Sequence, residues 1–154
     1  MHPWPRSCEV SARIAPSGSL VQLRAVIYLD TSVALAHLLA EDRRPPDSLW
    51  ERSLVSSRLL EYETWNRVNT LGLSASHGPL VQDLVERLGL VELRHEALAR
   101  AREPFPVAMR TLDAMHLSTA LYLKNRGFTV ALATYDERLR DAAIAVELEL
   151  AAVD

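Results

Sequence analysis

Four acidic residues are the candidates for chemistry in this sequence: Asp30, Glu63, Asp113 and Asp136. Each lies where an apolar strand or an amphipathic helix could have continued without an acid, in the segments IYLDTS, SSRLLEYETWN, RTLDAMHLSTA and LATYDERL. Carboxylates that crowd together repel one another, which raises their pKa values unless a cation neutralises them. A divalent metal is the simplest such cation, so the four acids predict a metal site lined by oxygen.

Each acid also has an ordinary structural interpretation when it is taken alone. Asp30 and Asp136 can cap helices, because Asp is among the best N-cap residues. Asp113 lies early in its helix, where the helix dipole favours an acid, and Glu63 can be a solvated or ion-paired helix residue. The metal-site hypothesis therefore depends on all four acids meeting at one place in the fold.

Short apolar runs alternate with amphipathic segments, and this alternation predicts strands alternating with helices. Thr31 or Ser32 can cap the first helix. We expect strands at 26–29, 53–56, 91–94 and 129–134, an edge strand at 147–153, and helices at 32–41, 58–73, 79–88, 95–103, 111–126 and 137–145. Such an order implies a three-layer α/β/α sandwich with a central parallel sheet. Ligands bind such sheets beyond the carboxyl ends of the strands, where Asp30 and Asp136 are expected.

Helical spacing places the other two acids. Glu63 lies at the boundary of the apolar face of its helix, whereas Glu61 is expected to point outward. Asp113 and His116 are three residues apart on another helix, so both can face the same way. A histidine on a partly buried helix face is more often a hydrogen-bonded packing residue than a catalytic one, and we interpret His116 in that way.

The length and composition indicate one folded domain. With 154 residues, 49% of them hydrophobic, the chain can bury a substantial core. Residues 1–25 carry three prolines and a Ser-Gly-Ser stretch, so we expect a flexible, dispensable N-terminal extension before the domain at 26–154. The first residues lack the apolar stretch of a secretory signal, and no apolar run reaches the roughly 18 residues that span a bilayer. We therefore expect a cytoplasmic protein that does not enter a membrane.

Cysteine content and net charge limit the kinds of metal site and nucleic-acid binding that this chain can have. The lone Cys8 allows neither an internal disulfide nor a zinc site built from several thiolates. The net charge of −3 argues against a nonspecific nucleic-acid coat, which depends on an excess of Lys and Arg. Acids gathered in one metal pocket would nevertheless lower the overall charge while arginines around its rim still contact phosphate.

Taken together, IYLDTS, the acid that follows SSRLLEYE, LDAMHLSTAL and LATYDERL resemble the PIN domain in their order and spacing. The resemblance is strongest to the VapC-type toxin ribonucleases of bacterial toxin–antitoxin pairs, and it covers the chain from Val26 to Asp154. It implies that the four acids named above correspond to the four acids of the family. It also implies that Thr134 supplies a hydroxyl that assists the site.

The same resemblance implies endonucleolytic cleavage of RNA that depends on Mg²⁺ or Mn²⁺. Asp30, Asp113 and Asp136 would bind the metal, and Glu63 would position or deprotonate a water on it. The products would carry a 5′ phosphate and a 3′ hydroxyl. The number of carboxylates suits either one or two metal ions.

A protein of this kind is expected to have protein partners as well as RNA. The resemblance implies a cognate VapB-type antitoxin and a homodimer. The apolar helix at 33–39, and the helix that carries Tyr62 and Trp65, are the surfaces we expect an amphipathic partner segment to cover.

Two alternatives remain beside a nuclease. The first is a catalytically inactive PIN-like module that binds RNA or a protein, although an inactive member would be expected to lose one of the acids. The second is an aspartate-based phosphatase or phospho-acceptor domain, which also places an acid after the first strand. Such a domain would normally carry a second acid two residues later, where this chain has Ser32.

Overall fold

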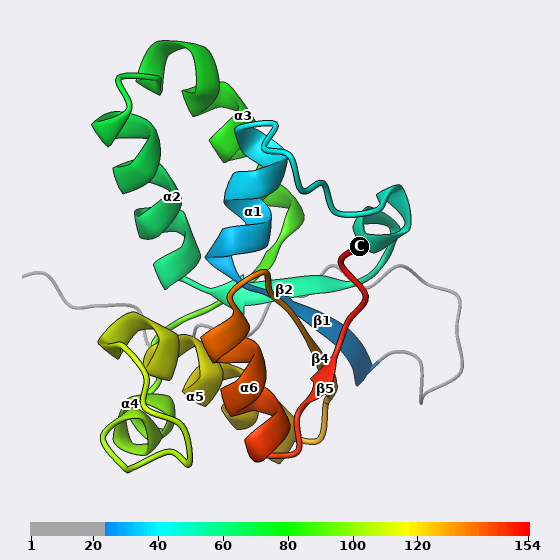
Figure 1. Ribbon diagram of the computed structural model, residues 1–154, viewed down its shortest axis with the longest axis vertical. Coiled ribbons are helices and arrows are strands. Elements are labelled where there is room, and N and C mark those ends of the chain that lie inside the picture. Colours follow the sequence, from blue (N-terminus) through cyan, green and yellow to red (C-terminus); the bar gives the residue numbers. More distant parts are fainter. Residues whose placement is uncertain (1–23) are drawn as a thin grey trace, which may run out of the picture.

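Five short strands pair in parallel at the centre of the protein, in the order β3-β2-β1-β4-β5 (Figure 1). The computed structural model describes residues 24–154. The strands are β1 (Ala25–Leu29), β2 (Leu54–Ser57), β3 (Gly89–Val91), β4 (Thr129–Ala133) and β5 (Glu149–Leu150). The helices are α1 (Thr31–Leu38), the short 3-10 helix η2 (Asp47–Glu51), α2 (Leu59–Thr70), α3 (Ser74–Arg87), α4 (His95–Ala101), α5 (Thr111–Asn125) and α6 (Glu137–Ala145). They provide the crossovers that parallel neighbours require.

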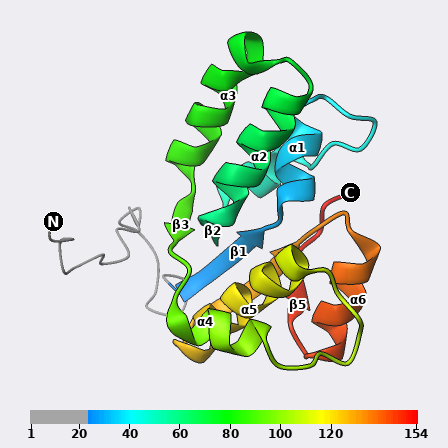
Figure 2. The same cartoon turned by 90° about the vertical axis from the view of Figure 1, so that its left-hand side faces the viewer.

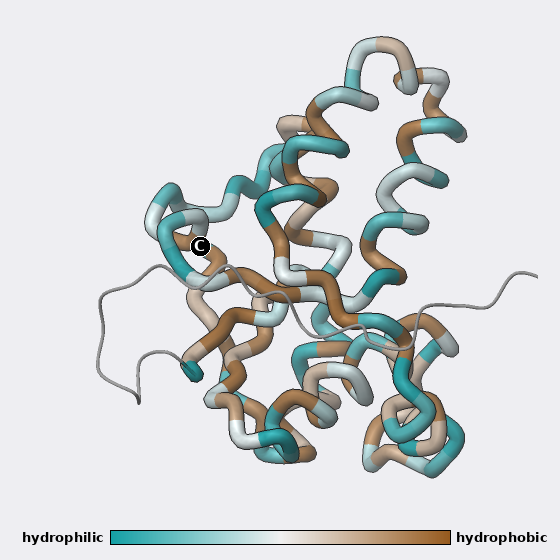
Figure 3. The backbone as a smooth tube through the Cα atoms, turned by 180° about the vertical axis from the view of Figure 1, so that it is seen from behind, coloured by the Kyte–Doolittle hydropathy of each residue, from teal (hydrophilic) through white to brown (hydrophobic). Residues whose placement is uncertain are grey.

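The sheet is buried on both faces, which explains why the central strands are almost continuously apolar. Val26 and Tyr28 of β1 pack in one core with α5 and α6, whereas Ile27 and Leu29 pack in a second core with α1, α2 and α3. Figure 2 shows α1, α2 and α3 on one side of the sheet and α4, α5 and α6 on the other. In Figure 3 the strand segments at the centre are mostly hydrophobic. The predicted three-layer α/β/α sandwich is confirmed.

The two central strands bring their carboxyl ends to the same edge of the sheet. β1 and β4 pair in register from Ala25 with Thr129 to Leu29 with Ala133. The chain therefore leaves β1 at Asp30 beside the point where it leaves β4, and the backbone N–H of Asp30 donates to the carbonyl of Ala133 at 2.9 Å. This edge is where ligands bind in open α/β sheets.

Helix α3 begins earlier than the sequence predicted. We expected Gly78-Pro79 to precede a helix, but both residues lie inside α3, which begins at Ser74. A Cβ atom at position 78 would come within 3.0 Å of the Trp65 ring. Gly78 therefore permits close packing of α3 on α2 and does not mark a helix boundary.

The edge strands are shorter than predicted. The strand expected at 91–94 is β3, which ends at Val91, where the carbonyl accepts the backbone N–H of Arg58 at 2.9 Å. Glu92 then leaves the sheet and pairs with the Arg58 guanidinium at 2.7 Å. On the opposite edge, only Glu149 and Leu150 of the expected strand 147–153 form β5.

Helix α1 also differs at both ends. Its N-cap is Asp30, and not Thr31 or Ser32, because the Asp30 carboxylate accepts the backbone N–H of Ser32. It ends at Leu38 instead of Glu41, and Ala40 adopts a positive φ of 50°. Val33, Ala34 and Ala36 of this helix are fully buried, whereas Leu35 and Leu39 are partly exposed. The expectation that helix 33–39 offers a partner surface therefore applies to few of its apolar side chains and stays a prediction.

The predicted N-terminal extension, residues 1–25, falls outside the described residues except for its last two positions. Of these, Ala25 is already the first residue of β1 and pairs with Thr129. Across residues 24–154, no helix combines the length and the apolar character that crossing a membrane requires.

The burial pattern predicts which apolar side chains stabilise this fold. Leu117 of α5 is fully buried, whereas Ile144 of α6 is 57% exposed. Leu117→Ala should lower the free energy of unfolding by about 2–5 kcal/mol, because it removes packing and leaves a cavity. Ile144→Ala, the matched control, should change it by less than about 0.5 kcal/mol. Urea unfolding of both variants measures the difference, and equal losses would contradict this assignment of the core.

Candidate active site

Asp30 is fixed by hydrogen bonds at the end of β1. Its Oδ2 accepts the Ser32 hydroxyl at 2.6 Å, the Ser32 backbone N–H at 3.2 Å and the Thr134 hydroxyl at 2.9 Å. The side chain is nearly buried, so its carboxylate depends on these donors. Capping of α1 therefore sets the orientation of an acid that faces the end of the neighbouring strand.

Thr134 links Asp30 to a second acid. Its Oγ1 donates to Asp30 and accepts the backbone N–H of Asp136 at 3.0 Å. Asp136 caps α6, with Oδ1 accepting the backbone N–H of Leu139 at 2.9 Å. The geometry agrees with the ordinary capping interpretation of both acids and also places them on either side of one hydroxyl.

Arg110 links Asp136 to Asp113. Its Nε lies 3.2 Å from Asp113 Oδ2, and its Nη2 lies 3.2 Å from Asp136 Oδ2. The Arg110 side chain is 69% exposed, so the guanidinium reaches the two carboxylates from the solvent side. A cation therefore bridges two acids that come from different helices.

Glu63 lies on the other side of the site and makes its contacts through side chains. Its Oε2 accepts the Thr31 hydroxyl at 2.7 Å and lies 2.6 Å from His116 Nε2. Thr31 follows Asp30 directly, and His116 is one turn after Asp113 on α5. All four predicted acids thus belong to one group of side chains at the carboxyl edge of the sheet.

The electrostatics of Glu63 and His116 indicate a charged pair. Partial burial raises the pKa of Glu63, but the hydrogen bond and charge of His116, with the Thr31 hydroxyl, outweigh it and hold that pKa below 4.5. Burial lowers the pKa of His116, but the hydrogen bond to Glu63 and the nearby negative charges outweigh it and hold that pKa above 6.5. Charge-assisted hydrogen bonds of this kind are stronger than neutral ones.

Sequence reasoning missed three participants. His116 was interpreted as a packing residue, and it is indeed buried, but it contacts a predicted site acid. Ser32 was considered only as a helix cap and as the position without a second acid, although it lies two residues after Asp30; Arg110, three residues before Asp113, was not considered. Those spacings are the only sequence signal for the contacts of Ser32 with Asp30 and of Arg110 with Asp113. The contact of Arg110 with Asp136, which is distant in sequence, is set by the tertiary fold. The catalytic roles of the acids stay predictions.

The donor chemistry fits a hard divalent cation. Among the described residues, no three His, Cys, Asp or Glu side chains converge into a ready metal cage. Mg²⁺ needs no such cage, since it keeps several waters and binds through one or two carboxylates. Arg110 already supplies a positive charge between Asp113 and Asp136. Hydrogen bonds to Asp30 and Glu63 reach only one oxygen of each carboxylate within the described chain, which leaves the other oxygen for a ligand.

Comparison with known proteins places this chain in a family. The model of the PIN domain matches residues 27–145. Ribonuclease VapC35 of Mycobacterium tuberculosis is 35% identical over 135 residues, which cover 82% of this chain and 96% of that protein. Ribonuclease VapC46 of the same organism is 36% identical over 126 residues, covering 77% of this chain and 91% of that protein.

A solved structure supports the fold. The crystal structure of PAE2754 from Pyrobaculum aerophilum aligns with a TM-score of 0.52 at 16% sequence identity. The alignment covers 84% of this chain and 93% of that one. At this identity the likeness concerns the fold alone.

The charged pair predicts a pH-dependent contribution to stability in metal-free protein. The contribution of Glu63 is complete above pH 4.5 and is lost as the pH falls through its lowered pKa. That of His116 is complete below pH 6.5 and is lost as the pH rises through its raised pKa. Glu63→Gln should therefore reduce the free energy of unfolding more at a pH of about 5.5 than at a pH of about 9. Urea unfolding in EDTA measures this, and an equal loss at both values would mean that the pair is not charged in the folded protein.

Proposed function

Since the chain belongs to the PIN domain family, we propose that it is a metal-dependent endoribonuclease and the toxin of a toxin–antitoxin pair. One observation carries the proposal: at the carboxyl edge of the sheet, Thr134 and Arg110 link Asp30, Asp136 and Asp113 by hydrogen bonds and ion pairs. Glu63 joins them by accepting the hydroxyl of Thr31, the residue that follows Asp30. The relatives named as VapC ribonucleases support RNA as the substrate.

Asp30, Asp113 and Asp136 are the residues we propose to hold Mg²⁺ or Mn²⁺, with Glu63 in contact through a water. A bound divalent ion would polarise the scissile phosphate and lower the pKa of a coordinated water. On this proposal, Arg110 leaves the two acids that it bridges when the ion binds. Its exposed guanidinium can then contact a phosphate oxygen of the RNA.

Glu63 is the proposed general base. Its lowered pKa keeps the carboxylate ionised at neutral pH, so it can accept a proton from the attacking water. The water oxygen forms a bond to phosphorus while the bond from phosphorus to the 3′ oxygen breaks. The leaving oxygen takes a proton from solvent, which gives a 5′ phosphate and a 3′ hydroxyl.

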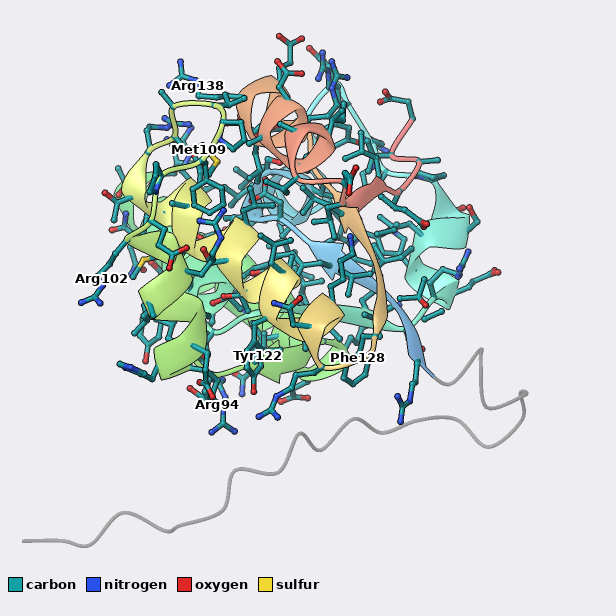
Figure 4. All side chains as sticks on the ribbon, turned by 90° about the horizontal axis from the view of Figure 1, so that it is seen from below. Arg94, Arg102, Met109, Tyr122, Phe128 and Arg138 are labelled. Atoms are coloured by element: carbon teal, nitrogen blue, oxygen red, sulfur yellow. The ribbon has the colours of Figure 1, made fainter. Side chains whose placement is uncertain are left out.

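Arginines beside the acids can bind the RNA backbone despite the negative net charge. A cavity of about 380 Å³ adjoins Thr134 and is lined in part by Arg43 and Arg140. Figure 4 shows Arg102 and Arg138 extending outward from the layer that contains α4, α5 and α6. Glu137 and Asp154 also line this cavity, so the arginines there would act as individual phosphate contacts and not as a uniformly positive surface. Cleavage by a cytoplasmic enzyme that uses such contacts would be sensitive to salt.

The acids provide the central test of the proposal. Asp30→Asn and Asp136→Asn keep an acceptor for helix capping but remove charge, so the variants should fold while RNA cleavage falls by about two orders of magnitude or more. EDTA should abolish cleavage by the wild type, and Mn²⁺ or Mg²⁺ should restore it. Gel assays with total RNA measure both effects.

Two substitutions on α2 distinguish a site acid from a neighbouring acid outside the site. Glu63→Gln should abolish most of the cleavage, whereas Glu61→Gln should leave it near the wild-type rate. Glu61 pairs with Arg58 at 2.9 Å, and a partly exposed pair of this kind contributes at most about 1 kcal/mol to stability. If wild-type protein binds RNA but neither wild type nor variants cut it, the chain is an inactive PIN-like binding module instead.

The partner proposal is a VapB-type antitoxin encoded beside this chain, together with self-association as a homodimer. Tyr62 of α2 is 67% exposed and remains a candidate contact for an amphipathic segment of the antitoxin. Coexpression of the adjacent reading frame should relieve growth inhibition. Tyr62→Ala should weaken that relief without changing cleavage by the free enzyme, and Ile144→Ala, which alters an exposed residue of α6, should not. Growth inhibition that no adjacent reading frame relieves would contradict the antitoxin proposal.

A further inference from the structure

His116 is buried between two polar partners from different layers of the fold. Its Nε2 lies 2.6 Å from Glu63 Oε2 on α2, and its Nδ1 lies 2.9 Å from the Tyr28 hydroxyl on β1. The Tyr28 oxygen also accepts the backbone N–H of Ser57 at 3.1 Å. Both ring nitrogens are therefore engaged, and the ring plane is fixed by contacts at each end.

Glu63 differs from the two capping acids in what holds it. Asp30 and Asp136 each accept a backbone N–H from the helix that they cap. Glu63 has a longer side chain, and its hydrogen bonds within the described chain come only from the side chains of Thr31 and His116. Its orientation consequently depends on groups that other elements supply.

We propose that His116 is the positioning residue for Glu63, an inference that rests on the nuclease function proposed above. The imidazole binds Oε2 of Glu63, so that Oε1 is the oxygen left to accept a proton from water. Tyr28 in turn holds the imidazole by its Nδ1, which gives an ordered series from Tyr28 through His116 to Glu63. His116 does not serve as a metal ligand, because neither ring nitrogen is available.

Two substitutions distinguish the effect of the His116 hydrogen bond from the effect of the volume that the side chain fills. His116→Leu fills the space without a donor, and kcat should fall by about 10- to 100-fold while KM for RNA changes little. His116→Gln retains an N–H donor, and a substantial part of kcat should return. Ser118→Ala on the same helix is the matched control, because the buried Ser118 hydroxyl has no hydrogen-bond partner in the described structure.

A spectroscopic measurement tests the contact without RNA or metal. In wild-type protein, nitrogen-edited NMR should detect the His116 Nε2 proton shifted downfield by its short bond to the carboxylate. Glu63→Gln should move this resonance upfield, and Asp30→Asn should leave it nearly in place. A resonance that Glu63→Gln does not alter would overturn the proposal, because Glu63 would not be its partner.

The outcomes distinguish the inference from the function on which it rests. If wild-type protein cleaves RNA and a folded His116→Leu variant cleaves it equally fast, His116 does not position Glu63. If His116→Leu does not fold, Tyr28→Phe is the alternative, since it keeps the imidazole but removes its contact at Nδ1. Loss of kcat in Tyr28→Phe supports the series, and wild-type kcat contradicts it. Absence of metal-dependent cleavage in the wild type would instead contradict the proposed nuclease function.

Discussion

Crowding of negative charge at one edge of the sheet is the constraint on which the rest of this site depends. Four carboxylates that approach each other must be neutralised or must take up protons. In this protein, helix N-termini stabilise the charges of Asp30 and Asp136, the Arg110 guanidinium lies beside Asp113, and the His116 imidazole lies beside Glu63. Each acid therefore has a donor or a positive charge beside it before any metal binds.

These compensating groups explain how the same residues can serve both structure and chemistry. A capping aspartate stabilises its helix whether or not it also binds a metal, so the capping interpretation and the metal-site hypothesis do not exclude each other. The compensating groups differ, however, in how firmly the fold holds them in place. Backbone donors at Asp30 and Asp136 are fixed by helices, whereas Arg110 is a solvent-exposed side chain that can leave without disturbing the fold.

The sequence predicted the features that follow from local periodicity. Apolar runs ending in Asp30 and near Asp136 gave the strand ends, and alternation of strands and helices gave the three layers. It did not predict that α3 begins before Gly78, because the close approach of Trp65 is a tertiary contact. For the same reason the pairing of Glu63 with His116, which are 53 residues apart, could not be predicted from spacing on either helix.

That pairing joins the two helical layers at the point where the proposed chemistry takes place. Glu63 belongs to α2 on one face of the sheet, while His116 belongs to α5 on the other, and His116 also contacts Tyr28 of the central strand. The position of Glu63 relative to Asp30 thus depends on the packing of both cores against β1. Because packed interiors transmit small displacements, a core substitution on either face can alter the geometry of the acids without touching them. The spacing between the two helical layers at β1 therefore helps to set the geometry of the site.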